Sequence, residues 1–258
     1  MMKTTMTSFV PILFFIVLLL DHFPLRSSAL AANPKPVLKY FDIRGAAEAS
    51  RVLLAIGGED YDDSRYKIDP ATFSSPAFLA EKESGELKAN LNRAPVLVTL
   101  DGTTIGQSKA IERYLAKRFD LMGNTPEEEA VIDCIAEHCR DVKDAAMRKG
   151  FSQFTKDKTE EEKAKARAEW FDEGLPTMLV KIDDYVKEIS TGEGFSVGSS
   201  MSYADVMIWA LLRDCSPADA KDTTNAAIDC TTLNGIADAI AAHPGVSKWV
   251  ENRPESMF

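Results

Sequence analysis

The sequence predicts a small α/β domain followed by an all-helical domain, and three observations support this fold class. Short runs of β-forming residues alternate with helical periodicity as far as Leu121, in the order βαβαββα. After Leu121 only helical patterns occur, and three helix-start signals punctuate them. The hydrophobic content of 45% over 258 residues is sufficient for a globular core. We expect the first domain at residues 34–121 and the helical domain at residues 125–258.

The elements of the first domain follow from their residue patterns. Val37–Phe41 is expected to be a strand, and the helix after it buries Val52 and Leu53 and ends at Gly58. Residues 62–67 are a weaker strand and residues 73–83 a short helix. Residues 95–100 and 103–106 form a hairpin across Asp101-Gly102, and the last helix presents Ile111 and Leu115 to the core.

The helical domain is marked by three candidate capping boxes. They begin at Thr125, Thr159 and Ser202, each followed three residues later by an acidic residue. The chain carries a formal net charge of −10, which argues against nucleic acid or an anionic membrane as a partner.

The N-terminus reads as a signal peptide over residues 1–31. Lys3 precedes twelve mostly apolar residues at positions 9–20, fewer than the roughly 20 that a spanning helix needs. Ala29-Leu30-Ala31 is a plausible cleavage site, after which no membrane span is expected. The expected location is the secretory pathway, as a luminal or secreted protein. In an alga with complex plastids the same signal would be the first half of a plastid address. An uncleaved anchor and a misassigned start codon are the alternatives.

The four cysteines and three histidines do not predict a metal or dithiol site. No C-x-x-C occurs and the histidines are scattered. Cys134 and Cys139 are five residues apart on a predicted helix, so they should not bridge. Cys215 and Cys230 flank a polar segment and are candidates for a disulfide in an oxidising compartment.

Seven segments in this order resemble the glutathione transferases, in particular their sigma class. They are LKYF (38–41), RGAAE (44–48), APVL (94–97), QSKAIERYL (107–115), DLMGNT (120–125), SYAD (202–205) and PGVSKW (244–249). The resemblance runs from Pro36 to Pro254 and implies a thioredoxin-like first domain. It also implies glutathione as co-substrate, a hydrophobic electrophile as second substrate, and a homodimer.

The resemblance assigns the glutathione site first to a proline and a helix start. Pro95 would be cis and would turn the backbone of Ala94 outward, to pair with the cysteinyl part of glutathione by strand addition. Gln107 and Ser108 would hold the γ-glutamyl end, where free N–H groups of a helix start suit a carboxylate. The structural alternative is a plain hairpin with Ser108 as N-cap.

Tyr40 is the candidate catalytic residue. A thiol with a pKa near 8.5 is mostly protonated at neutral pH, and a hydroxyl donor aimed at the sulfur favours the reactive thiolate. A tyrosine that ends a strand is otherwise an ordinary core residue. No cysteine lies at positions 44–47, which excludes the thiol chemistry of omega and glutaredoxin-like relatives.

The remaining glutathione contacts are implied by position. Phe78, Lys82 and Arg93 would approach the glycyl end, or would be ordinary surface residues. Asp141 lies nine residues, about 900° of helix, after Ile132, and therefore opposite its helix's apolar face. In the family the matching aspartate reaches glutathione bound to the partner chain. A solvated acid is the alternative.

The second-substrate pocket is expected around Ile43, Gly45, Ala46 and Met147. Ala46 stands where prostaglandin synthases of this family have an arginine, so conjugation is favoured over specific prostaglandin isomerisation. We expect a glutathione transferase whose Tyr40-activated thiolate attacks an apolar electrophile. The alternatives are a glutathione-dependent isomerase or peroxidase of lipid-derived substrates, and a catalytically weak binding or structural relative.

Overall fold

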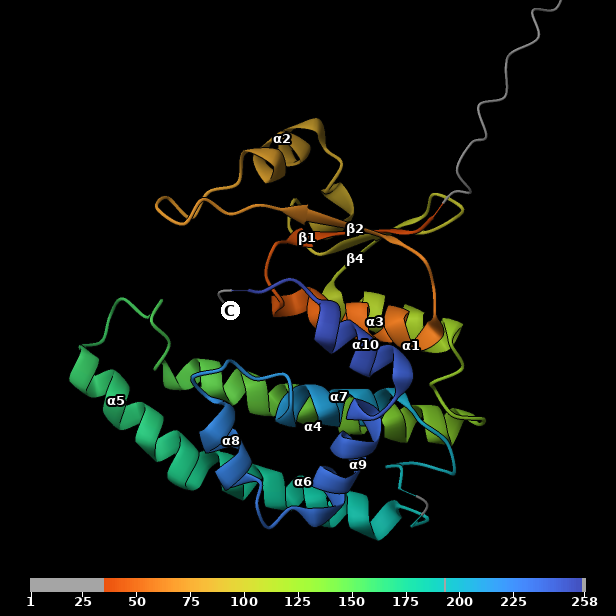
Figure 1. Cartoon of the computed structure of the whole chain (residues 1–258), viewed down its shortest axis with the longest axis vertical. Helices are drawn as coiled ribbons and strands as arrows, with labels where there is room; N and C mark the ends of the chain where they lie inside the picture. Colours follow the sequence, from red (N-terminus) through yellow and green to blue (C-terminus); the bar gives the residue numbers. More distant parts are fainter. Residues whose placement is uncertain (1–34, 193, 257–258) are drawn as a thin grey trace, which may run out of the picture. The chain divides into compact units, whose positions relative to one another are not determined.

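The computed structural model describes residues 35–192 and 194–256, which belong to one compact unit, Lys35–Phe258. The predicted signal peptide, residues 1–31, lies outside the described residues. Within the described part, an α/β portion comes first and helices follow it, as the sequence predicts (Figure 1).

A mixed four-stranded sheet forms the centre of the α/β portion. Its strands are β1 (Val37–Phe41), β2 (Asp62–Tyr66), β3 (Val96–Val98) and β4 (Thr104–Gly106). They lie in the order β2-β1-β3-β4, with β1 parallel to β2 and the other neighbours antiparallel. Tyr40 pairs with Arg65 across the parallel ladder. The element order βαβαββα is confirmed.

Three α-helices and two short 3-10 turns flank this sheet. They are η1 (Gly45–Ala47), α1 (Glu48–Gly57), α2 (Pro76–Ser84), η2 (Lys88–Asn90) and α3 (Ser108–Arg118). In Figure 1, α2 lies on one side of the sheet and α1 with α3 on the other. The prediction that α2 begins at residue 73 is wrong. Pro76 occupies its first turn, and Phe73 has a φ of 53°, outside the helical range.

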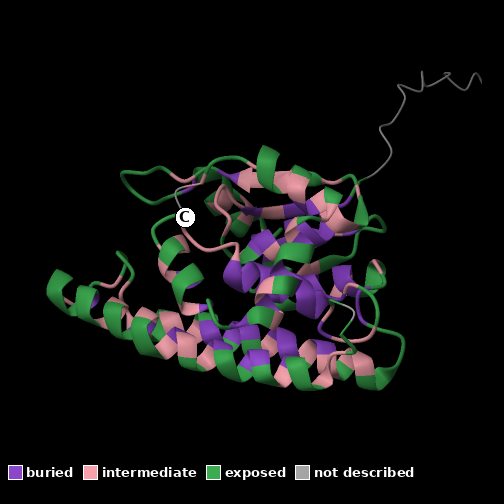
Figure 2. Cartoon of the chain, turned by 60° about the horizontal axis from the view of Figure 1, so that its bottom comes forward, coloured by how far each residue is buried: buried purple, intermediate pink, exposed green. Residues whose placement is uncertain are grey.

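The helical portion surrounds one completely buried helix. It contains α4 (Pro126–Lys149), α5 (Glu160–Glu169), the π-turn η3 (Trp170–Gly174), α6 (Leu175–Ile189), α7 (Tyr203–Leu212), α8 (Ala220–Ala226), α9 (Thr231–Ala241) and α10 (Pro244–Asn252). All ten residues of α7 are buried between α4, α9 and α1 (Figure 2). A helix that is apolar on nearly all sides, as α7 is apart from Asp205, is typically buried in this way.

The predicted helix starts are present, with one difference. Thr159 and Ser202 each form a reciprocal capping box. Thr125 accepts a hydrogen bond from the Glu128 N–H, but the Glu128 carboxylate accepts from the N–H of Asn124 at 2.6 Å. Only one of the two hydrogen bonds of the predicted capping box at Thr125 is therefore present.

The four cysteines are free thiols in this structure. Cys215 and Cys230 are therefore not joined in the disulfide for which the sequence made them candidates. Cys134 is exposed and Cys139 is buried on the same helix, as their spacing requires.

The two portions meet along α1. Both α7 and α10 pack against this helix. The start of α1 follows η1, which comes shortly after the end of β1, where Tyr40 lies. The helices that pack on α1 are therefore close to the part of the sheet that holds Tyr40.

Candidate active site

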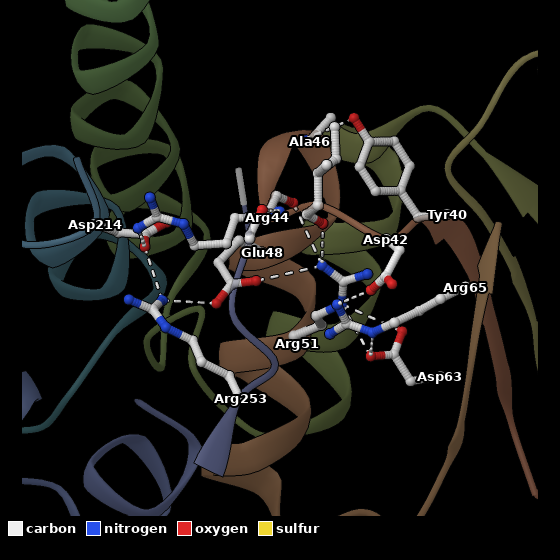
Figure 3. Close-up of polar contacts among 12 residues, drawn as sticks. Tyr40, Asp42, Arg44, Ala46, Glu48, Arg51, Asp63, Arg65, Asp214 and Arg253 are labelled. Atoms are coloured by element: carbon white, nitrogen blue, oxygen red, sulfur yellow. Dashed lines mark hydrogen bonds and ion pairs between the residues drawn. The ribbon is translucent and has the colours of Figure 1, made fainter. Parts of the chain in front are cut away.

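The Tyr40 hydroxyl lies against the start of η1. It accepts a hydrogen bond from the N–H of Ala46 at 3.1 Å (Figure 3). Gly45 makes this approach possible, because a Cβ at Gly45 would lie 2.7 Å from the hydroxyl oxygen. Gly45 also has a φ of +42°, which a side chain disfavours. Since the oxygen accepts from Ala46, the hydroxyl's own proton is available to a ligand.

Arg51 holds the loop between Tyr40 and Ala46. Its side chain is fully buried, and it donates to the carbonyl of Ile43 at 2.8 Å and more weakly to those of Phe41 and Arg44. A planar guanidinium with five N–H donors can serve several carbonyls at once. Arg51, a residue of α1, therefore stabilises the loop conformation that brings the Ala46 N–H to Tyr40.

Arg51 is also part of a chain of alternating charges that joins the two portions. The ion pairs run through Arg44, Asp214, Arg253, Glu48, Arg51, Asp63, Arg65 and Asp42, with N–O distances between 2.7 and 3.3 Å (Figure 3). Burial raises the pKa of Asp214, and the Glu48 charge adds to this effect, while Arg253 and Arg44 oppose it. The Asp214 carboxylate therefore depends on these arginines to remain ionised.

A cavity of about 530 Å³ opens beside this loop. Gly45, Ala46 and Ala49 line it from the α/β portion together with Ser108, and Met147 and Met207 line it from α4 and α7. The remaining lining residues are Glu48, Lys109, Glu112, Arg140, Lys143, Asp144, Ala210 and Asp214. A cavity of this size between two structural units is a typical small-molecule site.

A buried charged cluster forms one wall of this cavity. Arg140 donates to Glu112 at 2.6 Å, and the hydroxyl of Tyr203 donates to the same carboxylate at 2.5 Å. Arg140 also contacts the Tyr203 hydroxyl. Glu112 raises the pKa of Arg140, and burial raises that of Tyr203. The cluster links α3 to α4 and α7 at Glu112, one helical turn after Ser108.

The start of α3 presents unused backbone donors. Gln107 is the N-cap residue, with a φ of 67°, and its carbonyl accepts from the N–H groups of Ala110 and Ile111. Among the described residues, the N–H groups of Ser108 and Lys109 have no acceptor. The plain alternative, with Ser108 as N-cap, is wrong because Ser108 is already the first helical residue.

The peptide bond between Ala94 and Pro95 is cis, as predicted. Within the described part of the chain, the N–H and C=O of Ala94 form no hydrogen bond, whereas Pro95 accepts one from the Asn90 side chain at 2.9 Å. An unpaired backbone segment beside an unpaired helix start fits a peptide-like ligand that carries a carboxylate.

Both portions of the chain are similar to a known protein family. The family description "Glutathione S-transferase, N-terminal domain" matches residues 36–117, and "Glutathione S-transferase, C-terminal domain" matches residues 145–253. Glutathione S-transferase 4 of Caenorhabditis elegans is 31% identical over 179 residues, covering 68% of this chain and 77% of its own length. The chain belongs to the glutathione S-transferase family.

Two further relatives extend the comparison over nearly the whole described chain. The hematopoietic prostaglandin D synthase of Gallus gallus is 28% identical over 227 residues, covering 87% of this chain and 100% of its own. The crystal structure of monomeric Na-GST-3, a glutathione S-transferase from the hookworm Necator americanus, has a TM-score of 0.69 and 28% identity. It covers 87% of this chain and 100% of its own. The protein is therefore a glutathione transferase with a thioredoxin-like first domain, and glutathione is its co-substrate.

Some predicted glutathione contacts of this transferase lie at the cavity and others do not. Ser108 lines it, and Tyr40 touches the lining residue Ala46. Phe78 packs on Phe41 and Tyr66, with ring centroids 4.9 and 5.6 Å apart. Three of the predicted contacts, Lys82, Gln107 and Arg93, are exposed and lie outside the cavity lining. Arg93 donates a hydrogen bond to the Asn90 carbonyl.

Asp141 is exposed and faces away from the apolar stripe of α4, as its spacing predicts. It lines a separate cavity of about 240 Å³ with His138, Lys181 and Tyr185. Within this one chain, Asp141 therefore does not contribute to the cavity beside Ala46.

The predicted second-substrate residues divide in a similar way. Gly45, Ala46 and Met147 line the cavity, whereas Ile43 packs against the hydrophobic core and offers its carbonyl to Arg51. Sequence reasoning missed Glu112, Arg140 and Lys143. The available signal for Arg140 was a charge at helical spacing from Ala136, inside an apolar stripe.

Two kinds of feature are absent from the described residues. No helix there is both long and apolar enough to cross a membrane. No group of three or more histidine, cysteine or acidic side chains there could hold a metal ion.

Proposed function

We propose that Tyr40 activates the glutathione thiol of this transferase, and that the thiolate then attacks an apolar electrophile in the cavity beside Ala46. The observation that supports this proposal is the hydrogen bond from the Ala46 N–H to the Tyr40 oxygen. It fixes the hydroxyl and leaves its proton for the sulfur. A hydrogen bond to the charged form lowers the pKa of a thiol, so more thiolate is present at neutral pH.

Glutathione would lie along the edge formed by β3 and the start of α3. The γ-glutamyl carboxylate would receive the free N–H groups of Ser108 and Lys109 together with Gln107, and the cysteinyl backbone would pair with Ala94 beside Pro95. Phe78, Lys82 and Arg93 are the candidates for the glycyl end. The unpaired groups at this edge support the placement, because buried or half-buried backbone donors generally have partners.

We propose a sigma-like homodimer in which Asp141 reaches the glutathione of the partner chain. Asp141 is exposed and does not line the cavity beside Ala46 in its own chain, which fits this role. Na-GST-3 is described as monomeric, so the oligomeric state requires its own measurement. If Asp141→Ala leaves glutathione affinity unchanged in a dimer shown by sedimentation, the role across subunits is wrong.

The proposed biological role is detoxification of apolar electrophiles within the secretory pathway, after removal of residues 1–31. The signal-like N-terminus supports the location. N-terminal sequencing of the protein from its native cells tests it, because a chain that begins at Met1 contradicts cleavage.

The catalytic role is tested by Tyr40→Phe in a chloronitrobenzene conjugation assay, with the pKa of bound glutathione measured by thiolate absorbance. We expect kcat to fall on the order of tenfold to a hundredfold, the effect of losing one hydrogen bond to a charged group, and the thiol pKa to rise. Tyr61→Phe is the matched control, because the buried Tyr61 hydroxyl has no hydrogen-bond partner among the described residues. Equal thiol pKa values in Tyr40→Phe and the unmodified protein would show that Tyr40 is not the activating group.

A further inference from the structure

We propose that the electrophile carries an anionic group, such as a carboxylate, on an apolar body, and that Lys143 binds this anion. The inference rests on the proposed transferase function and specifies its second substrate. Lys143 lies on α4 where two cavities meet, and it forms no ion pair with any other described residue.

The second of these cavities is a mostly apolar chamber of about 250 Å³. Phe151, Trp170 and Phe171 line it, together with Val142 and Leu175. It shares Lys143, Met147, Ala210 and Asp214 with the cavity beside Ala46. The two are therefore adjacent along α4, and one ligand can extend from the thiol site into the aromatic chamber. Such a chamber favours apolar and aromatic ligand bodies.

Every acidic group of the aromatic chamber has a cationic partner. Asp214 is paired with Arg44 at 3.1 Å and with Arg253 at 2.8 Å. Asp219 is paired with Arg167 at 2.7 Å and also accepts from the Ser216 hydroxyl. Neither carboxylate is therefore available to a ligand cation without the loss of an existing ion pair.

Lys143 differs from these groups. Among the described residues it has no hydrogen bond and no ion pair, although its charge is near enough to Asp214 to help lower that carboxyl's pKa. The spacing of three and four residues places Arg140, Lys143 and Met147 along one face of α4, toward the cavities. The lysine stem can lie along apolar surface while its ammonium group remains accessible. An unpaired ammonium at the edge of an aromatic chamber fits an amphipathic anion.

Asp144, next to Lys143 on α4, is a second charged residue of this region, and it is acidic. It has no ion pair among the described residues either, but it lines only the cavity beside Ala46. A ligand that reaches the aromatic chamber therefore meets one unpaired charge there, and that charge is positive.

The reaction itself needs no further reactant. With an α,β-unsaturated ketone, the thiolate sulfur forms a bond to the β-carbon, and the π electrons move to the carbonyl as an enolate. The enolate then takes a proton at the α-carbon. The product contains all atoms of both substrates, and nothing is oxidised or reduced.

Ethacrynic acid and its methyl ester are a matched pair of such ketones, one with a carboxylate and one without. We expect the unmodified protein to have a lower KM for the acid, after subtraction of the uncatalysed rate. In Lys143→Gln the ratio of ester KM to acid KM should fall about tenfold, the usual effect of one charge-assisted hydrogen bond. Lys165→Gln, on exposed α5 and outside both cavities, should retain the original ratio.

Calorimetric binding of the acid and the ester, without glutathione, separates the two proposals. Turnover with equal acid-to-ester ratios in Lys143→Gln and the unmodified protein would overturn the role of Lys143 and leave the transferase proposal standing. Lys143-dependent binding of the acid without turnover would support the anion site and contradict the proposed catalysis. Thermal unfolding shows whether each variant is folded.

Discussion

Gly45 provides a direct test of the Tyr40 geometry at the scale of a single residue. A Cβ added there would lie 2.7 Å from the Tyr40 hydroxyl oxygen, so the hydroxyl or the loop must move. A small displacement of a catalytic group can cost up to about a hundredfold in rate. For Gly45→Ala we expect kcat for conjugation to fall about tenfold or more, measured at saturating glutathione.

Gly102→Ala is the control for backbone strain. Gly102 also has a positive φ, of 83°, but an added Cβ there meets no atom within 4 Å. Both variants should lose roughly 1 kcal/mol of stability in urea unfolding. A similar loss of kcat in both would mean that the effect of Gly45→Ala comes from the backbone and not from Tyr40.

The four thiols should differ strongly in reactivity. Burial raises the pKa of Cys139 to about 12 and that of Cys230 to about 11, whereas Cys134 is exposed. At pH 8 the buried thiols are therefore almost entirely protonated, and only the thiolate reacts with an alkylating agent. We expect timed iodoacetamide labelling with peptide mass spectrometry to modify Cys134 first, and Cys139 and Cys230 only after unfolding. A cross-linked Cys215–Cys230 peptide in a non-reducing map would contradict the free thiols of the structure.

At this scale, local motifs predicted some residues and could not predict others. The positions of Tyr40 near the end of β1 and of Ser108 at the start of α3 follow from short sequence segments. Glu112 and Arg140 act through partners that are distant in sequence: Glu112 bonds to Tyr203, 91 positions away, and Arg140 bonds to Glu112, 28 positions away. A single sequence does not contain such pairings, because they depend on how the two portions pack.

The start of α7 is deeply buried. Asp205 is completely buried and accepts hydrogen bonds from the N–H of Ser202 and the N–H of Ser196, both at 2.7 Å. In Asp205→Ala these two donors lose their charged acceptor in a place that water does not reach. We expect a loss of about 3 to 5 kcal/mol in the free energy of unfolding, measured with urea.

The exposed capping box of α5 gives the comparison. In Thr159→Ala the Glu162 N–H loses its acceptor, but it can bond to water instead. A loss of about 1 kcal/mol is expected. Equal losses in the two variants would show that burial does not determine the strength of the cap at α7.

The elements themselves were largely predictable because their signals are local. Gly58 ends α1 in a left-handed conformation, and proline in the first turn marks both α2 and α4. The predicted start of α2, Phe73, is three residues too early. The structure instead pairs its ring with Phe154, from the loop after α4, at 5.9 Å. Tertiary contact, not local propensity, decided that position.

For the whole molecule, the order of the two portions was predictable but the contacts that join them were not. The sequence pattern changes character near Leu121, which separates the α/β part from the helices. The charged chain from Arg44 to Asp42 combines residues of β2, α1, the segment after α7 and the C-terminal end of α10. Its members are individually unremarkable surface-type residues in the sequence, and only the packing of α7 and α10 on α1 brings them together.

Arg253 tests how far this chain joins the two portions. It bridges Glu48 and Asp214, both at 2.8 Å, and all three side chains are largely buried. In Arg253→Met two buried carboxylates lose a shared cation, so we expect a loss of about 2 to 4 kcal/mol in the free energy of unfolding. Arg118→Met, which removes the more exposed pair with Glu59, should cost less than about 1 kcal/mol.

The pH dependence distinguishes loss of charge compensation from loss of packing. The pKa of Asp214 is already raised by burial, and Arg253 is the strongest of the cations that hold it down. Without Arg253 the folded-state pKa rises further above its unfolded value, so proton uptake favours the folded form as the pH falls toward that higher pKa. The stability difference between Arg253→Met and the unmodified protein should therefore shrink from pH 7 to pH 5, as measured by urea unfolding. Adding Asp214→Asn to Arg253→Met should remove most of that pH dependence. A difference that stays constant with pH would mean that Arg253 stabilises the fold through its packed stem, and that the charges between the two portions contribute little.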